Sequence, residues 1–342
     1  MVRVKSLVLI VTLTFAFSNV SLSQGGVEHM NELGAAFADL KKDTWKYLRT
    51  ITKGKSARKS EKKREKLLEE YRTQIALVES IEPYNGDATL KDATLKYLEL
   101  SNTVLREDYD KIVDMEAVAE ESYDAMEAYI LANKRANKKL TAAGDELEEA
   151  EQAFAEKNNI TLLEAEQDRK SEKISNAADM LDYYNEVYLI FFKVYKQEAY
   201  VLAAQQSNDI TAFEQNVNAL KMEAEMALKK LDTMRRYEGS GALIMAARKA
   251  MEFYKDEAEN EFPKVSDFYI KKDNFEKAKE IMDSKKKKDR TQEDVDKYNA
   301  AVKEYNKAAG SINETNEEMN DSRNDMLDQW NKSVEDFFKV HS

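Results

Sequence analysis

The chain has 342 residues, a formal net charge of −12 and no cysteine. The lack of cysteine excludes disulfides, thiolate metal ligands and cysteine nucleophiles. An acidic chain is a poor match for a general binder of nucleic acids or anionic membranes. Nine glycines, two prolines and 35% charged residues favour long helices. Since no segment alternates polar and apolar residues with a period of two, we predict an all-α protein.

The N-terminus has the pattern of an export signal. Arg3 and Lys5 precede an apolar run over 7–17, and small residues lie just before Gln24. The run is shorter than the roughly 20 apolar residues that span a bilayer. We therefore predict a cleavable signal peptide over 1–23 and no transmembrane segment in the mature chain. Cleavage would remove two basic residues and no acid, which changes the net charge from −12 to −14.

A segment near the first proline is repeated later in the chain. Residues 84–115 match 237–268 without a gap, at a displacement of 153 positions. The match keeps a glycine turn and one apolar helical face, as in Tyr84/Tyr237, Gly86/Gly239, Leu90/Leu243, Ala93/Ala246, Lys96/Lys249, Glu99/Glu252, Lys111/Lys264 and Asp114/Asp267. We interpret the chain as two tandem, internally duplicated up-and-down bundles of long antiparallel helices, over 24–160 and 161–342. One elongated eight-helix object is the alternative.

Turn residues and apolar periodicity predict where each helix begins and ends. In chain order the expected helices cover 28–52, 60–81, 88–131, 141–157, 161–206, 210–236, 242–282 and 291–338. Pro263 falls inside the seventh of these helices, where a missing backbone donor predicts a kink.

The last helix has the most regular pattern. Apolar residues follow a heptad spacing, and Arg323 falls at one of the core positions. Four asparagines also recur every seven residues along one edge of this seam, at Asn299, Asn306, Asn313 and Asn320. They form either the polar edge of a packed helix or a row of amides that binds a glycan or a peptide strand.

The Tyr-Asn doublets of this helix carry a resemblance. Tyr298-Asn299 and Tyr305-Asn306, followed by Trp330-Asn331, resemble the Tyr-Asn-rich final helix of uncharacterised exported bacterial all-helical families, several of which are surface proteins or lipoproteins. The likeness covers about the last 50 residues. It implies residence in the cell envelope and assigns no activity and no site. This chain departs from the lipoprotein members because no cysteine follows its signal peptide.

Two basic segments contrast with the acidic background. One of them covers 53–66, and the other consists of Lys285, Lys286, Lys287, Lys288 and Arg290. In the frame of the repeat, the second segment lies close to a further basic stretch that begins at Lys134 and Arg135. The repeat therefore predicts that the second segment and this stretch lie at the same inter-helix connection. Such a connection is either a solvated loop that keeps the protein soluble or a docking point for an anionic envelope polymer or an acidic partner protein.

Catalytic and metal-binding motifs are absent from the sequence. The two histidines, His29 and His341, lie near the ends of the mature chain, where we expect too much motion for a catalytic base. No phosphate-binding, dinucleotide or calcium loop occurs. We therefore predict no catalytic, cofactor-binding or metal-binding residues. A pocket that encloses converging carboxylates with raised pKa values would contradict this expectation.

These observations predict an exported, non-enzymatic helical protein that binds or scaffolds partners in the bacterial cell envelope, in the periplasm or at the cell surface. The partner would be an envelope protein or an anionic polymer, and not a nucleic acid. A carboxylate-based envelope enzyme is the second hypothesis. A membrane-active helical toxin is the third, since only the short apolar segment 188–194 could enter a bilayer.

Overall fold

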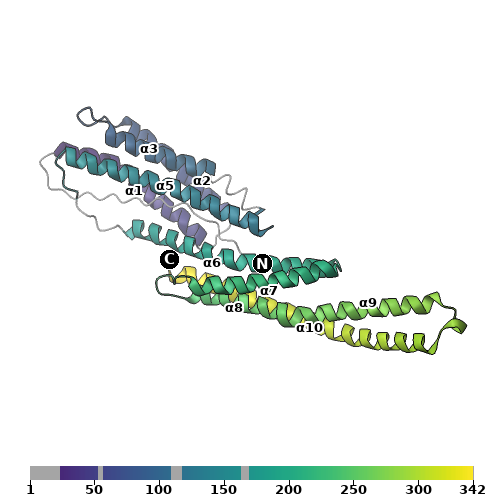
Figure 1. Cartoon of the computed structure of the whole chain (residues 1–342). Coiled ribbons are helices and arrows are strands. Elements are labelled where there is room, and N and C mark those ends of the chain that lie inside the picture. Colours follow the sequence, from purple (N-terminus) through teal and green to yellow (C-terminus); the bar gives the residue numbers. More distant parts are fainter. Residues whose placement is uncertain (1–23, 53–56, 109–117, 163–168, 342) are drawn as a thin grey trace. The chain divides into compact units, whose positions relative to one another are not determined.

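The computed structural model describes the chain except for residues 1–23, 53–56, 109–117, 163–168 and 342 (Figure 1). Helices make up 89% of the described residues, and no strand occurs among them. The prediction of an all-α protein is confirmed. The predicted signal peptide lies outside the described residues. None of the helices in the described part combines the length and apolar character that crossing a bilayer requires.

Contacts divide the described chain into two compact units. The first unit comprises residues 24–186 and 336–341, and the second comprises residues 187–335. The division at Val187 falls inside a helix, whereas the sequence placed the boundary between the bundles at residue 160.

Among the described residues, the first unit contains four complete helices, one wide helical turn, the first part of a further helix over 169–186 and the end of the last helix from residue 336. The complete helices are α1 (Gln24–Thr52), α2 (Ala57–Ser80), α3 (Thr89–Thr103) and α5 (Tyr123–Lys157), and a π-helical turn, η1 (Val104–Asp108), extends α3. In chain order each of these helices packs against the next (Figure 1). Their buried faces carry large rings, including Phe37 and Tyr97, whose centroids lie 5.9 Å apart.

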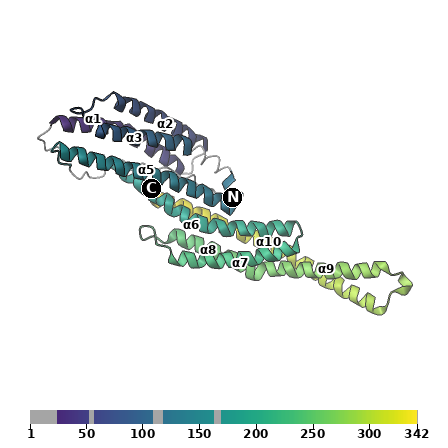
Figure 2. The ribbon, with the colours of Figure 1, turned by 45° about the horizontal axis from the view of Figure 1, so that its top comes forward.

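The second unit contains most of α6 (Arg169–Gln206) and α10 (Gln292–Val340), and all of the helices between them. These are α7 (Ile210–Thr233), α8 (Ala242–Asp256), the π-helical turn η2 (Glu257–Glu261) and α9 (Phe262–Ser284). The short 3₁₀ turn η3 (Lys287–Asp289) joins α9 to α10, and these two helices form a long hairpin (Figure 2). Inside the core, the rings of Phe191 and Trp330 stack at 4.3 Å.

The helix boundaries repeat with the displacement of the sequence match. The bounds of α2, α3 and η1 at 57, 80, 89, 103, 104 and 108 recur in α7, α8 and η2 at 210, 233, 242, 256, 257 and 261. Both α2–α3 and α7–α8 are joined by a turn whose glycine, Gly86 or Gly239, has φ of 79°. Glycine adopts this left-handed conformation without the steric cost that a Cβ atom imposes.

Burial also recurs in the flanking helices, at displacements of 154 for α1 and 183 for α5. The buried positions 27, 30, 33, 36, 37, 40, 44 and 47 of α1 recur in α6 at 181, 184, 187, 190, 191, 194, 198 and 201. Those of α5 at 136, 140, 143, 147, 151, 154 and 155 recur in α10 at 319, 323, 326, 330, 334, 337 and 338. The displacement therefore grows from 153 at η2 to 183 at α10, so the α9–α10 hairpin holds 30 additional residues.

Two predicted boundaries in the first unit are wrong. The expected helix over 88–131 ends before a turn at Glu120 and Glu121, and α5 already begins at Tyr123. The Ser122 hydroxyl accepts a hydrogen bond from the Ala125 amide at 3.1 Å, which caps the new helix. The predicted break between 131 and 141 does not occur, because that stretch contains no glycine or proline and places Ala136 and Leu140 on the buried face.

The structure has a π-helical turn just before Pro263, the residue at which a kink was predicted. The helix widens one turn earlier, in η2, and Pro263 lies in the first turn of α9, where its missing amide hydrogen costs little. The corresponding turn η1 of the first unit has no proline. A π-helical turn at this position is therefore common to both units and does not depend on the proline.

Candidate functional site

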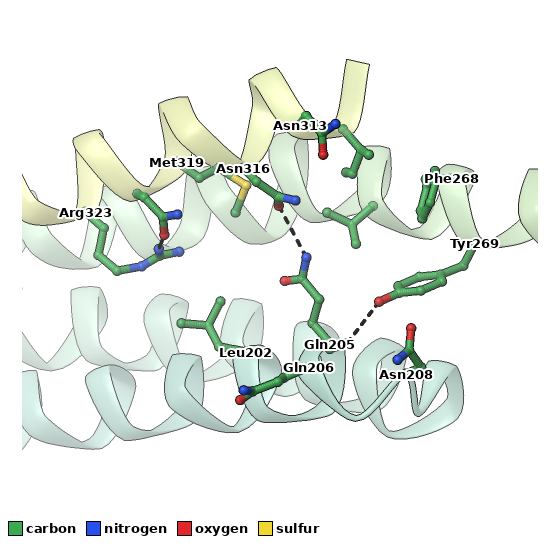
Figure 3. Close-up of a pocket in the computed structure, with 13 residues that line it drawn as sticks. Leu202, Gln205, Gln206, Asn208, Phe268, Tyr269, Asn313, Asn316, Met319 and Arg323 are labelled. Atoms are coloured by element: carbon green, nitrogen blue, oxygen red, sulfur yellow. Dashed lines mark hydrogen bonds between the residues drawn. The ribbon is translucent and has the colours of Figure 1, made fainter. Parts of the chain in front are cut away.

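A cavity of about 850 Å³ lies in the second unit between α6, α9 and α10 (Figure 3). Its size falls within the range of about 300–1,000 Å³ that is typical of small-ligand sites. Amide side chains contribute most of its polar lining, from Gln205, Gln206, Asn208, Asn313, Asn316 and Asn320. Apolar and aromatic side chains complete it, among them Leu202, Met319, Phe268 and Tyr269.

The end of α6 supplies one wall of the cavity. Asn208 follows the helix in a left-handed conformation, with φ of 55°, and asparagine tolerates this conformation better than most residues. The Asp209 carboxylate then accepts a hydrogen bond from the Ala212 amide at 2.9 Å and caps α7. The end of α6 and its connection to α7 thus supply three of the amide residues that line the cavity, Gln205, Gln206 and Asn208.

Hydrogen bonds hold the facing walls in register. Gln205 Nε2 donates to Asn316 Oδ1 on α10 at 3.3 Å, and the Tyr269 hydroxyl on α9 donates to the Gln205 carbonyl at 3.0 Å. Figure 3 shows both bonds crossing the space between the helices. Because the same residue of α6 contacts both other helices, the geometry of the lining is set before any ligand binds.

A buried ionic cluster adjoins the cavity through Arg323, which is 9% exposed and lines it. Arg323 Nε donates to Glu198 on α6, and Nη2 donates to Glu257 of η2 at 2.7 Å. Its Nη1 donates to Asn320 Oδ1 at 2.7 Å. Both glutamates are 2% exposed and do not line the cavity. Arg323 therefore separates the two carboxyl groups from the space that a ligand could occupy.

Burial controls the protonation of this cluster. Loss of hydration, together with the charge of Glu198, raises the pKa of Glu257 to about 9. Burial also raises the pKa of Glu198, although its ion pair with Arg323 opposes that change. Both carboxyl groups therefore keep a proton to a higher pH than exposed glutamates do. The side chains of Glu198 and Glu257 also interact with each other, and the buried Tyr254 hydroxyl has no hydrogen-bond partner within the described residues.

The corresponding positions of the first unit carry no such cluster. Thr44 corresponds to Glu198 in the burial pattern, Val104 begins η1 as Glu257 begins η2, and Leu140 corresponds to Arg323. All three are buried. The second unit alone therefore holds charged residues at these three core positions.

Only two of the four regularly spaced asparagines of α10 line the cavity. All four asparagines are exposed, but only Asn313 and Asn320 line the cavity, because Asn299 and Asn306 lie nearer the start of α10. Asn316 lines it as well, although its heptad position predicts only a core residue. The sequence also did not identify Gln205, Gln206 or Asn208. The signal for the ionic cluster was present, because Arg323 at a core position requires a buried partner.

The basic segment over 285–290 and the basic stretch that begins at Lys134 do not lie at equivalent connections, so that prediction is wrong. Lys134 and Arg135 are exposed in the interior of α5, while Lys285–Arg290 joins α9 to α10. At this connection Lys285 pairs with Asp294 at 2.7 Å, and Lys286, Lys287 and Lys288 are exposed. The repeat does not extend through this region because the α9–α10 hairpin is longer.

The sequence predicted that His29 lies near a mobile chain end, but the structure places it in a packed helix. It belongs to α1, is 6% exposed, and lies 5.8 Å and 5.7 Å from the rings of Tyr84 and Phe154. Burial lowers its pKa. Within the described residues no group of three or more histidine, aspartate or glutamate side chains could hold a metal ion.

Comparisons of the chain with protein-family models, with curated proteins and with solved structures found no match.

Proposed function

We propose that this protein is an exported, non-enzymatic binding protein of the bacterial cell envelope, and that the cavity of the second unit takes its ligand. The convergence of six amide side chains on one cavity is the observation that supports this function. The basic start and apolar run of the N-terminus support export. We also propose that the units arose by tandem duplication, since helix bounds and burial recur with the sequence match.

The lining is suited to binding and poorly suited to catalysis. An amide offers both a donor and an acceptor, and near neutral pH it acts neither as a general acid or base nor as a nucleophile. The two carboxyl groups that could act as acid and base lie behind Arg323. A ligand in the cavity would therefore be held by hydrogen bonds and apolar contacts, and released unchanged. A glycan and a peptide strand both satisfy this description.

The regular spacing of the asparagines provides a matched test of the ligand site. Asn313→Ala changes a residue that lines the cavity, and Asn306→Ala changes one on the same helix that does not. We expect Asn313→Ala to weaken binding to cell-envelope extract, measured with the immobilised mature protein, and Asn306→Ala to leave it unchanged. Equal effects of the two variants would assign binding to a surface outside the cavity.

The α9–α10 connection supports a second binding function. Three exposed lysines, Lys286, Lys287 and Lys288, could dock an anionic envelope polymer or an acidic protein. Lys285 contributes less because Asp294 neutralises it. Reversal of the three exposed lysines to glutamate should abolish salt-sensitive binding to envelope material and leave thermal unfolding nearly unchanged. Retained binding would reduce these lysines to a solubilising role.

An enzyme that uses carboxyl groups is the remaining alternative, and Glu198 and Glu257 are the observation that favours it. They converge and their pKa values are raised, as in many acid–base pairs. For catalysis Arg323 would have to move away and open a path from the cavity. The rate at which the guanidinium protons of Arg323 exchange with solvent, measured by NMR with and without envelope extract, tests this movement. Permanent protection of those protons would exclude it.

A further inference from the structure

We infer that the ligand of this cavity is an uncharged saccharide. The inference rests on the proposed binding function and narrows the ligand to one chemical class. Three properties of the cavity support it: the hydrogen-bonding capacity of the lining, its balance of charge and its aromatic side chains.

The amides match the hydrogen-bonding character of sugar hydroxyl groups. Each hydroxyl both donates and accepts, and so does each amide. The bonds already present use only part of this capacity. Asn316 accepts from Gln205 through Oδ1, and Asn320 accepts from Arg323 through Oδ1, so both Nδ2 groups remain to donate. Gln205 Oε1 remains to accept. The facing walls from α6 and α10 therefore offer both donors and acceptors to a ligand.

The charge balance argues against a charged ligand. Arg323 is the single charged side chain in the lining, and two buried carboxyl groups contact it. An anion would have to compete with these carboxyl groups for the guanidinium. No carboxylate lines the cavity, so a cation would find no partner there. A neutral ligand can bind without disturbing the ionic cluster.

The aromatic side chains provide a surface for the C–H face of a sugar ring. Phe268 and Tyr269 both line the cavity, and their ring centroids lie 5.7 Å apart at an angle of 56°. The hydroxyl of Tyr269 is fixed on the Gln205 carbonyl, so this ring cannot turn away freely. Sugars combine apolar faces with hydroxyl edges, and the cavity combines aromatic rings from α9 with amides from α6 and α10 (Figure 3).

A peptide is the weaker candidate for the same space. An extended peptide usually adds a strand to a sheet edge, and the described part of the chain contains no sheet. A helical peptide needs an apolar groove, whereas amides dominate the polar lining here. A free peptide terminus would bring a charge that the neutralised Arg323 cannot balance.

Isothermal titration of the mature full-length protein tests the ligand class. The probes are neutral tri- to hexasaccharides of glucose, xylose and N-acetylglucosamine, with oligogalacturonate as an anionic comparator and end-capped uncharged peptides of similar length. We expect binding of a neutral saccharide and no binding of oligogalacturonate. Added salt should leave the affinity unchanged, because no ion pair forms.

Matched variants assign the binding to the cavity. Asn316→Leu should lower the affinity for the bound saccharide by about tenfold or more, because it removes a polar partner and fills part of the space. Phe268→Leu should lower it as well, while Asn306→Leu should not. Cavity-dependent binding of only the peptides or of oligogalacturonate would overturn the saccharide inference and leave the proposed function standing. If none of the probes bound in a way that depends on Asn316, both the saccharide inference and the proposed binding function of the cavity would be overturned.

Discussion

Glu257 is the residue whose chemistry departs most from that of a surface glutamate. Its pKa of about 9 in the folded protein lies above the value of about 4.3 in an unfolded chain. Between these values the folded state binds more protons, so the free energy of unfolding decreases as the pH rises through this window. We expect Glu257→Gln to remove this dependence and to stabilise the protein by about 1–3 kcal/mol at pH 8, with a smaller gain at pH 5.

Urea unfolding at several pH values measures this effect. Glu259→Gln is the control, because Glu259 lies in the same helical turn, is exposed, and has its pKa lowered by a hydrogen bond from Lys221. A lowered pKa acts in the opposite direction and at lower pH, so the control should keep the slope of the wild-type protein between pH 5 and 8. If the free energy of unfolding of Glu257→Gln depended on pH as steeply as that of the wild-type protein, the raised pKa of Glu257 would be contradicted.

The contribution of the ionic cluster to helix packing can be tested by replacing Arg323 and its two glutamates with the residue types at the corresponding positions of the first unit. Arg323→Leu alone leaves two buried carboxyl groups without a cation and should cost about 3–5 kcal/mol. The triple variant Glu198→Thr, Glu257→Val and Arg323→Leu replaces the whole cluster and should be about as stable as wild type, or more stable. Denaturant unfolding of both variants checks this. A triple variant as unstable as the single one would show that the cluster stabilises the fold.

The two glycine turns permit a parallel test between α2–α3 and α7–α8. Gly86 and Gly239 both have φ of 79°, and a Cβ atom at either would meet no atom within 4 Å. Alanine should therefore destabilise both turns by a similar amount, about 1 kcal/mol, through backbone strain alone. Gly310→Ala in the interior of α10 has equal space and a helical backbone, so it should stabilise by about 0.5–1 kcal/mol. Thermal melts of the three variants give the comparison.

The elements that could be predicted from the sequence are those with local signals. The glycine turns and the start of α10, where Thr291 and Asp294 cap each other, follow from residues close in the chain. The helix break at Ser122 was missed because a lone serine is a weak signal beside continuous apolar periodicity. Contacts of high sequence separation were not predictable. Glu198 and Arg323 are 125 positions apart, and Arg323 by itself does not identify Glu198 among 65 acidic residues.

For the whole molecule, each of the two units has a core of its own. This predicts that a destabilising substitution increases local unfolding mainly in the unit that contains it. Arg323→Leu alters the core of the second unit, whereas the buried faces of α2 and α3 belong to the first. We expect amide hydrogen exchange to accelerate in α7, α8 and η2, where protection depends on that core, and to stay slow in α2 and α3. Mass spectrometry of peptides from these segments resolves the difference.

Leu140→Ala, at the corresponding position of α5, should produce the reverse pattern, since it opens a cavity in the first core. Equal acceleration in all segments of both variants would mean that the chain unfolds as one cooperative body, and the division at Val187 would then have no thermodynamic meaning.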